Sequence, residues 1–470
     1  MSTLIVSIPE NFYLQEFNYI IKVLLIDFLG LDYTLEMYDG DKVKIRLKGD
    51  ESDKALSIEN ILFNTPTEEW LKESSLPLSP LPRWNILDDL PEVRLCKKDL
   101  PIIYGRLLSN GRYFDQGKNF IHLGVDIFGS CFFMLTRYEE IIVSERDEHE
   151  RFPAKASLAY REGFLSRPIV NEYVEILWAL LKRLWPGLER KQHSYKVLLT
   201  HDVDHPFVVY DQSWYQILRN VSADLINRKN ISLSFQRIKC KVKNDPKLDP
   251  ANTFDFIMDL SEKNGLQSEF YFITDHPAGT LDGSDYSLES PYIQVLIDRI
   301  YKRGHRIGLH ASYNSYCDSQ QIKREFEKLI MLAEKLSIKQ DSYGGRQHYL
   351  RWKNPTTWQN WEDTGLNYDS TLSFADYAGF RTGVCYEYPV YNLVTRKSLN
   401  LFEKPLIVMD VTLFGSSYMN LKVEESFRYV EHLSKCCRLF GGTFVLLWHN
   451  TSLIEKWQKN IYRDVLYNII

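Results

Sequence analysis

Two aspartates, separated by one residue, directly follow a short apolar segment at residues 196–200. The segment is typical of a buried strand, and the polar residues lie where such a strand leaves its sheet. Because side chains alternate along a strand, Asp202 and Asp204 point in the same direction. Two carboxylates in one small volume favour a cation or a strong hydrogen-bond donor between them, so the pair indicates a metal site, an acid–base pair, or both. The alternative is a turn in which Asp204 accepts hydrogen bonds from local backbone amides.

Three more segments carry polar side chains that could meet the two aspartates. His310 ends a short strand expected from residue 304, where a histidine is either a metal ligand or a hydrogen-bonded loop residue. Arg346 could hold a carboxylate through two parallel hydrogen bonds, although a lone loop arginine is more often a surface residue. His449 follows the apolar run 443–448. Several strands that end in such residues favour one shared site at the carboxyl edge of a parallel sheet.

Strands and helices alternate after residue 195, and this arrangement would bring the strand ends together. The strand patterns lie at 196–200, 270–274, 406–409 and 443–448. The helical patterns lie at 253–264, 320–336 and 424–439. Such alternation predicts a parallel barrel or a doubly wound sheet, with the chemistry at the carboxyl ends of the strands.

The N-terminal residues predict a small α/β domain over 1–72. Apolar residues recur at helical spacing along 14–28, and Gly30 supplies a stop signal. The alternating segment 43–48 is typical of an edge strand.

Residues 73–190 predict a loop-rich and helical connector that precedes a barrel domain over 191–470. Prolines interrupt the periodicity up to residue 118, and helical patterns follow at 127–142 and 170–185. Between these helices, the charged run at 147–152 predicts a solvated loop.

The composition is that of an ordinary globular protein. The chain has 470 residues, of which 44% are hydrophobic and 25% charged, with a net charge of −5. This balance favours no nucleic-acid partner. The start lacks the pattern of a secretory signal, and no apolar run is long enough to cross a bilayer. Seven scattered cysteines without a CxxC pair indicate reduced thiols, so a cytoplasmic location without a transmembrane segment is expected.

The strand-end motifs, taken in order, resemble those of the polysaccharide deacetylase family, also called the NodB homology or carbohydrate esterase family 4. The motifs are Thr200-His-Asp-Val-Asp-His-Pro206, Gly304-His-Arg-Ile-Gly-Leu-His-Ala-Ser-Tyr-Asn314, Gly345-Arg-Gln-His348 and Leu447-Trp-His-Asn450. The resemblance implies a distorted (β/α)7 barrel that holds one divalent metal ion, with zinc as the expected metal. It also implies an enzyme that removes acetyl groups from glycans. The N-terminal half resembles an uncharacterised extension that precedes this domain in a bacterial subgroup of the family.

The resemblance also implies roles for single residues. Asp202 matches the general base, Arg346 the arginine that orients it, and His449 the general acid. Asp204 and His310 match metal ligands. Asn314 stands where the family has a second ligating histidine, so its amide oxygen is the expected third ligand, although imidazole suits zinc better. His348 stands where the family has a proline.

The expected function is a metal-dependent deacetylase acting on an N-acetylated sugar or polysaccharide in bacterial polysaccharide metabolism. Two aspartates and His449 favour this enzyme. Asn314 favours the alternative, a catalytically impaired deacetylase-like protein that only binds glycan. A third possibility is a metal phosphoesterase built on the Asp-x-Asp pair, for which residues 344–346 are the one weak phosphate-binding candidate in the sequence.

Overall fold

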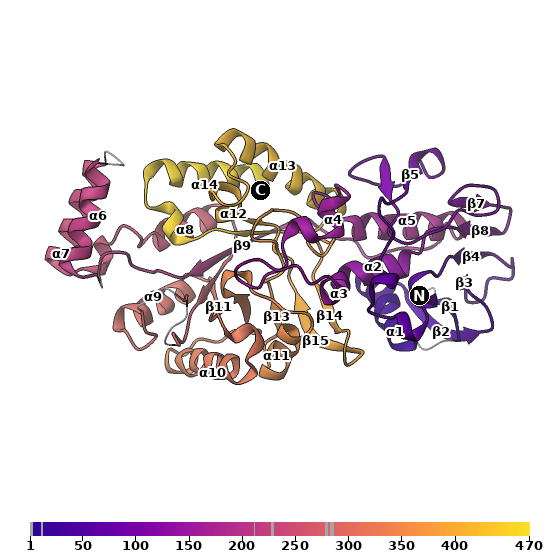
Figure 1. Cartoon of the computed structure of the whole chain (residues 1–470), viewed down its shortest axis with the longest axis horizontal. Helices are drawn as coiled ribbons and strands as arrows, with labels where there is room; N and C mark the ends of the chain where they lie inside the picture. Colours follow the sequence, from indigo (N-terminus) through magenta and orange to yellow (C-terminus); the bar gives the residue numbers. More distant parts are fainter. Residues whose placement is uncertain (1–2, 11–12, 211, 227–229, 278–280, 283–285) are drawn as a thin grey trace.

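A computed structural model describes residues 3–10, 13–210, 212–226, 230–277, 281–282 and 286–470. An N-terminal region lies at one end of an elongated molecule, and a curled sheet with surrounding helices fills the rest (Figure 1). Within the described residues, no helix is both long enough and apolar enough to span a membrane.

The N-terminal region is built on a sheet with the strand order β2-β1-β3-β4-β8-β7. The strands are β1 (Thr3–Pro9), β2 (Asp32–Tyr38), β3 (Val43–Leu47), β4 (Ala55–Ile58), β7 (Phe114–Gln116) and β8 (Phe120–Leu123). Strand β1 runs parallel to β2 and antiparallel to β3. A separate pair, β5 (Arg83–Asn85) and β6 (Asp99–Pro101), forms a small ribbon. The main sheet therefore joins strands from both sides of residue 72.

Helices pack on this sheet through the apolar stripes expected from the sequence. They are α1 (Leu14–Ile21), which continues as a π-helix over Lys22–Phe28, α2 (Ile127–Leu135), α3 (Glu139–Ile142), α4 (Leu158–Arg161) and α5 (Ile169–Leu184). Phe17, Ile20 and Leu24 on the first of these are fully buried. This burial explains why the segment is helical, because it removes one apolar face from water.

The larger sheet has the order β14-β15-β13-β12-β11-β10-β9-β17-β16 and curls into a half-barrel of nine strands within the described residues. The strands are β9 (Lys196–Val203), β10 (Ser268–Phe272), β11 (Arg306–Ala311), β12 (Gly344–Gln347), β13 (Tyr368–Asp369), β14 (Tyr388–Asn392), β15 (Lys397–Glu403), β16 (Val408–Met409) and β17 (Thr443–Leu447). Neighbours pair in parallel, except that β14 is antiparallel to β15. The protein is therefore a mixed α/β protein, with the predicted alternation after residue 195.

Helices cover the outside of the half-barrel. They are α8 (Phe254–Lys263), α9 (Pro291–Lys302), α10 (Ser319–Lys335), α11 (Thr356–Thr364), α12 (Asp410–Phe414), α13 (Val423–Phe440) and α14 (Lys456–Ile469). Strands β10 and β12 are buried along their whole length, as expected for parallel strands enclosed on both faces.

A helical hairpin, α6 (Trp214–Ile226) and α7 (Ile231–Lys243), follows β9 and projects from the end of the molecule opposite the N-terminal region (Figure 1). This hairpin is not among the elements predicted from the sequence.

One hydrophobic core runs through both regions. The Tyr19 ring of α1 lies 4.8 Å from the Tyr391 ring of β14, centroid to centroid, and Phe132 of α2 lies 5.4 Å from the same ring. The buried Glu16 carboxylate forms an ion pair with Arg396 at 2.7 Å. The N-terminal region is therefore packed against the half-barrel through both apolar and ionic contacts.

Candidate metal and catalytic site

Four of five consecutive strands bring the predicted residues to one edge of the half-barrel. Strands β17, β9, β10, β11 and β12 are consecutive in the sheet, and His310 on β11 is directly paired with Arg346 on β12. A cavity of about 340 Å³ opens at their carboxyl ends. It is lined by Arg151, Asp202, Asp204, His205, Leu281, Asp282, His310, His348, Tyr349, Leu350, Met409, Val411, Tyr418 and His449.

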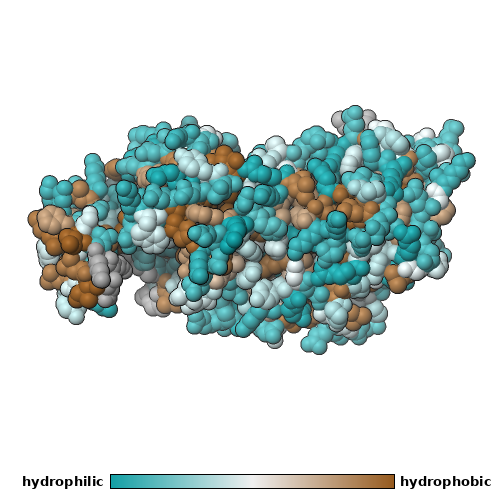
Figure 2. Space-filling view, turned by 90° about the horizontal axis from the view of Figure 1, so that it is seen from above, coloured by the Kyte–Doolittle hydropathy of each residue, from teal (hydrophilic) through white to brown (hydrophobic). Residues whose placement is uncertain are grey.

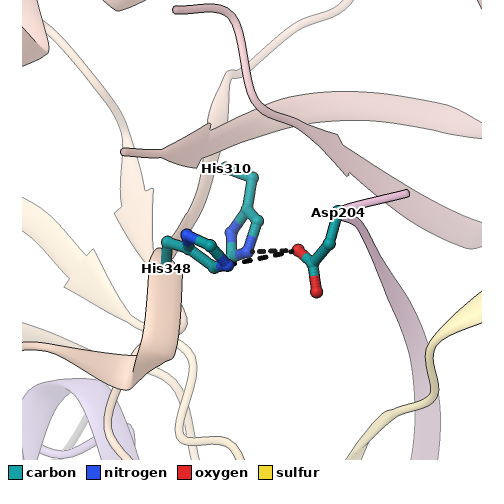
Figure 3. A group of neighbouring side chains, drawn as sticks. All are labelled: Asp204, His310 and His348. Carbon is teal, nitrogen blue, oxygen red and sulfur yellow. Dashed lines mark ion pairs between the residues drawn. The ribbon is translucent and has the colours of Figure 1, made fainter. Parts of the chain in front are cut away.

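Asp204, His310 and His348 form a group whose ligand-type atoms all lie within 4.8 Å of one another. Their side chains point toward one another (Figure 3). The His310 Nε2 atom is 3.1 Å from Asp204 Oδ1, and the His348 Nε2 atom is 3.7 Å from the same oxygen. One carboxylate oxygen and two imidazole nitrogens thus surround one small volume.

The outer hydrogen bonds of the two imidazoles fix which nitrogens face this volume. His310 Nδ1 lies 2.9 Å from the Arg346 carbonyl oxygen, which can only accept, so Nδ1 carries the proton. His348 Nδ1 lies 2.9 Å from Asp282 Oδ1 and donates to it in the same way. In the neutral rings, both Nε2 lone pairs therefore point at Asp204 Oδ1, which finds no hydrogen-bond donor among the described residues. Lone pairs that converge on a buried carboxylate oxygen need a proton or a cation between them.

The pKa shifts reflect the same arrangement. Burial alone would raise the pKa of Asp204, but a His310 ring that is protonated on Nε2 would donate to its carboxylate, and this donation and the charges of His348, His310 and His449 hold the pKa well below its usual range. Burial would lower the pKa of His310, but the Asp202 and Asp204 carboxylates raise it. Positive charge is therefore stabilised here, and the residues present fit a divalent cation.

Asn314, the expected third ligand, does not line the cavity, whereas His348 is the third member of this group. Asn314 is exposed, and its Oδ1 atom accepts a hydrogen bond from Arg351 Nη1 at 2.9 Å. Arg351 is itself held between the Tyr313 and Tyr316 rings, each 4.0 Å from its guanidinium carbon. The loop after β11 therefore turns Asn314 away from the cavity.

Asp202 is held beside this group by Arg346. Both side chains are buried, and Arg346 Nη1 donates to Asp202 Oδ1 at 2.7 Å. The remaining donors of Arg346 bond to Thr200 Oγ1 and to the backbone and side chain of Ser370, so the contact to Asp202 is single rather than bidentate. Asp202 Oδ2 lies 3.7 Å from His310 Nε2. One oxygen of Asp202 is thus oriented, and the other faces the candidate metal group.

His449 lies next to the other carboxylate oxygen of Asp204, with its Nε2 atom 3.6 Å from Asp204 Oδ2. Its Nδ1 atom lies 2.7 Å from Asp410 Oδ1, and its backbone N–H donates to Asp410 Oδ2 at 3.0 Å. Burial lowers the pKa of His449, but Asp410 outweighs this effect and, together with Asp204 and Asp202, raises the pKa to about 10. The imidazole is therefore kept protonated and able to donate.

Sequence reasoning missed Asp410, although a signal was present. Asp410 directly follows the predicted strand at 406–409, much as Asp202 comes two residues after the predicted strand at 196–200. The rule that located the other strand-end residues would have found it.

The charged run at 147–152 differs from the expected solvated loop. Residues 147–153, called here the connector loop, reach the rim of the cavity, and Arg151 is buried there. Its Nε atom donates to Asp147 Oδ2 at 2.7 Å, and its Nη1 atom donates to the Tyr349 carbonyl oxygen at 3.0 Å. This pairing satisfies the buried charge, which explains how a charged segment can be packed. The N-terminal region thus supplies one of the residues that line the cavity, Arg151.

Residues 4–186 match a family of unknown function, DUF7033. The match covers the N-terminal region and ends before β9. No curated protein matches the sequence significantly.

Three solved structures overlap with part of the chain. One, from Mycobacterium smegmatis and assigned as a polysaccharide deacetylase, is 14% identical, with a TM-score of 0.38 over 59% of this chain and 85% of that one. Puue allantoinase is 13% identical, with a TM-score of 0.36 over 60% and 85% of the two chains. A Pseudomonas aeruginosa PAO1 protein, also assigned as a polysaccharide deacetylase, is 12% identical, with a TM-score of 0.35 over 60% and 90%. At these values the overlaps assign no activity to this chain.

Proposed function

We propose that this protein is a metal-dependent hydrolase that removes acetyl groups from a sugar or polysaccharide, and that these are N-acetyl groups. One observation carries the proposal. The imidazole lone pairs of His310 and His348 converge on Asp204, between a carboxylate held by Arg346 and an imidazole held by Asp410. The ordered strand-end motifs and the half-barrel support a distorted (β/α)7 barrel of the polysaccharide deacetylase type.

The residues present divide the work of hydrolysis. Asp204, His310 and His348 would hold a divalent cation, and two imidazoles with one carboxylate suit zinc. When bound, such an ion would supply Lewis-acid polarisation of the acetyl carbonyl.

The two proton-transfer residues stand on either side of the candidate metal group. Asp202 would accept the proton of the attacking water, while Arg346 orients its carboxylate. His449 would donate a proton to the departing amine, and Asp410 keeps it protonated for that purpose.

The seven free cysteines fit a reducing compartment.

The geometry favours this function over its rivals. Asn314 in a ligand position favours the alternative of an impaired protein that only binds glycan. His348, however, places an imidazole in the candidate metal group. A phosphoesterase would need free donors at 344–346. Gly344 and Gly345 lie within buried strand β12, and Arg346 already bonds to Asp202, Thr200 and Ser370.

Metal content and acetate release test the proposal together. The purified protein should bind close to one equivalent of zinc, measured by mass spectrometry of the metal, and should release acetate from at least one member of a panel of N-acetylated sugars. Asp204→Ala should lose both properties. The control, Asp376→Ala, changes an aspartate outside the cavity lining and should keep both. A protein that binds zinc but cleaves no acetylated sugar would instead support the glycan-binding alternative, and equal metal in parent and Asp204→Ala would exclude the site.

A further inference from the structure

The hairpin α6–α7 carries a large set of exposed apolar side chains that its own packing does not use. On α7, Ile231, Phe235, Ile238 and Val242 recur at helical spacing, and three of the four expose 67–73% of their surface. On α6, the exposed apolar residues are Trp214, Tyr215, Leu218, Leu225 and Ile226. Figure 2 shows hydrophobic residues gathered at the end of the molecule where this hairpin lies.

The two helices are held together by a different set of residues. Ile217, Val221 and Cys240 form a small core of their own with Val209, and Arg237 forms a buried ion pair with Asp224 at 2.6 Å. The exposed stripe on α7 therefore lies outside the helix–helix contact. A patch of this kind on a well-packed element marks an interaction surface.

The charge of the hairpin indicates what kind of partner fits. The sequence from 213 to 244 has seven lysines and arginines against one aspartate, although the whole chain has a net charge of −5. That aspartate, Asp224, is buried against Arg237. Lys239 and Lys243 on α7 flank the exposed apolar stripe and can extend past it.

We propose that the hairpin is a docking element for the surface of an anionic lipid bilayer. Apolar and aromatic side chains flanked by lysines are the combination that inserts into the interface and contacts anionic headgroups at the same time. A second copy of this chain fits less well, because two hairpins of the same strong positive charge would repel each other. The hairpin projects from the end of the molecule, so a flat surface can approach it (Figure 1).

Vesicle co-sedimentation of the full chain tests the proposal without any substrate. The protein should bind vesicles of phosphatidylcholine and phosphatidylglycerol, bind pure phosphatidylcholine vesicles much more weakly, and lose binding as salt rises. The double change Ile231→Ser with Phe235→Ser should weaken binding at least about tenfold. Lys239→Gln with Lys243→Gln should weaken it by about fivefold for each lysine.

A matched control uses exposed apolar residues elsewhere on the surface. Val295→Ser with Met331→Ser changes two side chains on α9 and α10 that are 63% and 68% exposed, and it should leave vesicle binding unchanged. Circular dichroism melts verify that each variant folds, and the lysine variant keeps the test valid if the apolar variant does not fold. Absence of vesicle binding, or equal loss in the hairpin and control variants, would overturn the proposal. So would a dimer by light scattering that the hairpin variant converts to monomer.

Discussion

Two groups of buried charges differ in how their charges are matched, and in the first of them every charge has a partner. Arg137 donates to Glu139 Oε1 at 2.9 Å and to Glu140 Oε1 at 2.8 Å. Arg381 donates to both oxygens of Glu140, and the Leu158 N–H donates to Glu139 Oε2. This group, Arg137, Glu139, Glu140 and Arg381, is called the closed cluster. It joins the N-terminal region to the half-barrel and does not line the cavity.

The strand-end group, Asp204, His310 and His348, is less completely buried and is satisfied differently. Asp204 Oδ1 faces the acceptor nitrogens of His310 and His348. The group also opens into a cavity, whereas the closed cluster does not. The difference teaches that burial of charge alone does not mark a functional site. A group of hydrogen-bond acceptors that face one another beside a cavity does mark one, because it is stable only when a proton or a cation is bound between them.

The largest effect on activity is expected at Asp202, which pairs with Arg346 through one oxygen and faces the candidate metal group with the other. Asp202→Asn keeps a hydrogen-bonding side chain beside Arg346 but cannot accept a proton, so acetate release should fall by about 10²–10⁴-fold. Zinc content should remain at the parent level, because Asp202 is not in the candidate metal group. Parallel loss of zinc and activity would place Asp202 among the ligands.

The closed cluster should respond through stability instead. Glu140→Gln leaves Arg137 and Arg381 buried without their shared countercharge, so the free energy of unfolding in urea should fall by about 3–5 kcal/mol. The control Glu36→Gln, in an exposed pair with Arg46, should cost about 0–1 kcal/mol. Folded Glu140→Gln should still bind zinc. A variant with normal stability and no zinc would reverse the assignment of the two clusters.

The choice between His348 and Asn314 sharpens the comparison further. His348→Ala removes one of the three converging ligand atoms, so zinc affinity should fall by about 100-fold or more, whereas Asn314→Ala should change it less than about threefold. Titration with a competing chelator measures both. Asn314→His should bring no gain, since residue 314 faces Arg351. A gain there would restore Asn314 as the expected ligand.

A smaller effect is expected at Glu325, a buried carboxyl with no ion pair among the described residues. Burial raises its pKa from 4.5 to about 7, although hydrogen bonds from Ser312 and Gln321 partly oppose the shift. The folded state therefore binds the proton more tightly than the unfolded state does. Its stabilising contribution is complete below about pH 4.5 and is lost as the pH rises through 7, so stability should fall by about 2 kcal/mol between about pH 5 and 8. Glu325→Gln should remove this part of the pH dependence in urea titrations.

The local parts of the site could be predicted from the sequence. Asp202, Asp204, His310 and His449 each stand at or just after an apolar run, and the structure places all four around the same cavity. The helices at 320–336 and 424–439 are confirmed as α10 and α13 to within a residue. These features depend on residues close together in the chain.

The parts that depend on distant contacts could not be predicted. Asn314 was chosen for its spacing from His310 along the chain, but the loop after β11 turns outward to meet Arg351. His348 reaches the group because β12 pairs with β11, which spacing within one motif cannot show. Arg151 is buried only because Asp147 and Tyr349 meet it there.

Arg151 has a consequence for how this protein can change over generations. One residue of the cavity lining, Arg151, is encoded in the residues that match DUF7033, and the rest of the lining is encoded after residue 195. A lineage that recombined the half-barrel away from its N-terminal partner would lose that residue. Replacements at Arg151 should therefore be coupled to replacements at Tyr418, whose hydroxyl it contacts across the boundary, rather than to replacements at Tyr349, which it contacts only through the backbone carbonyl.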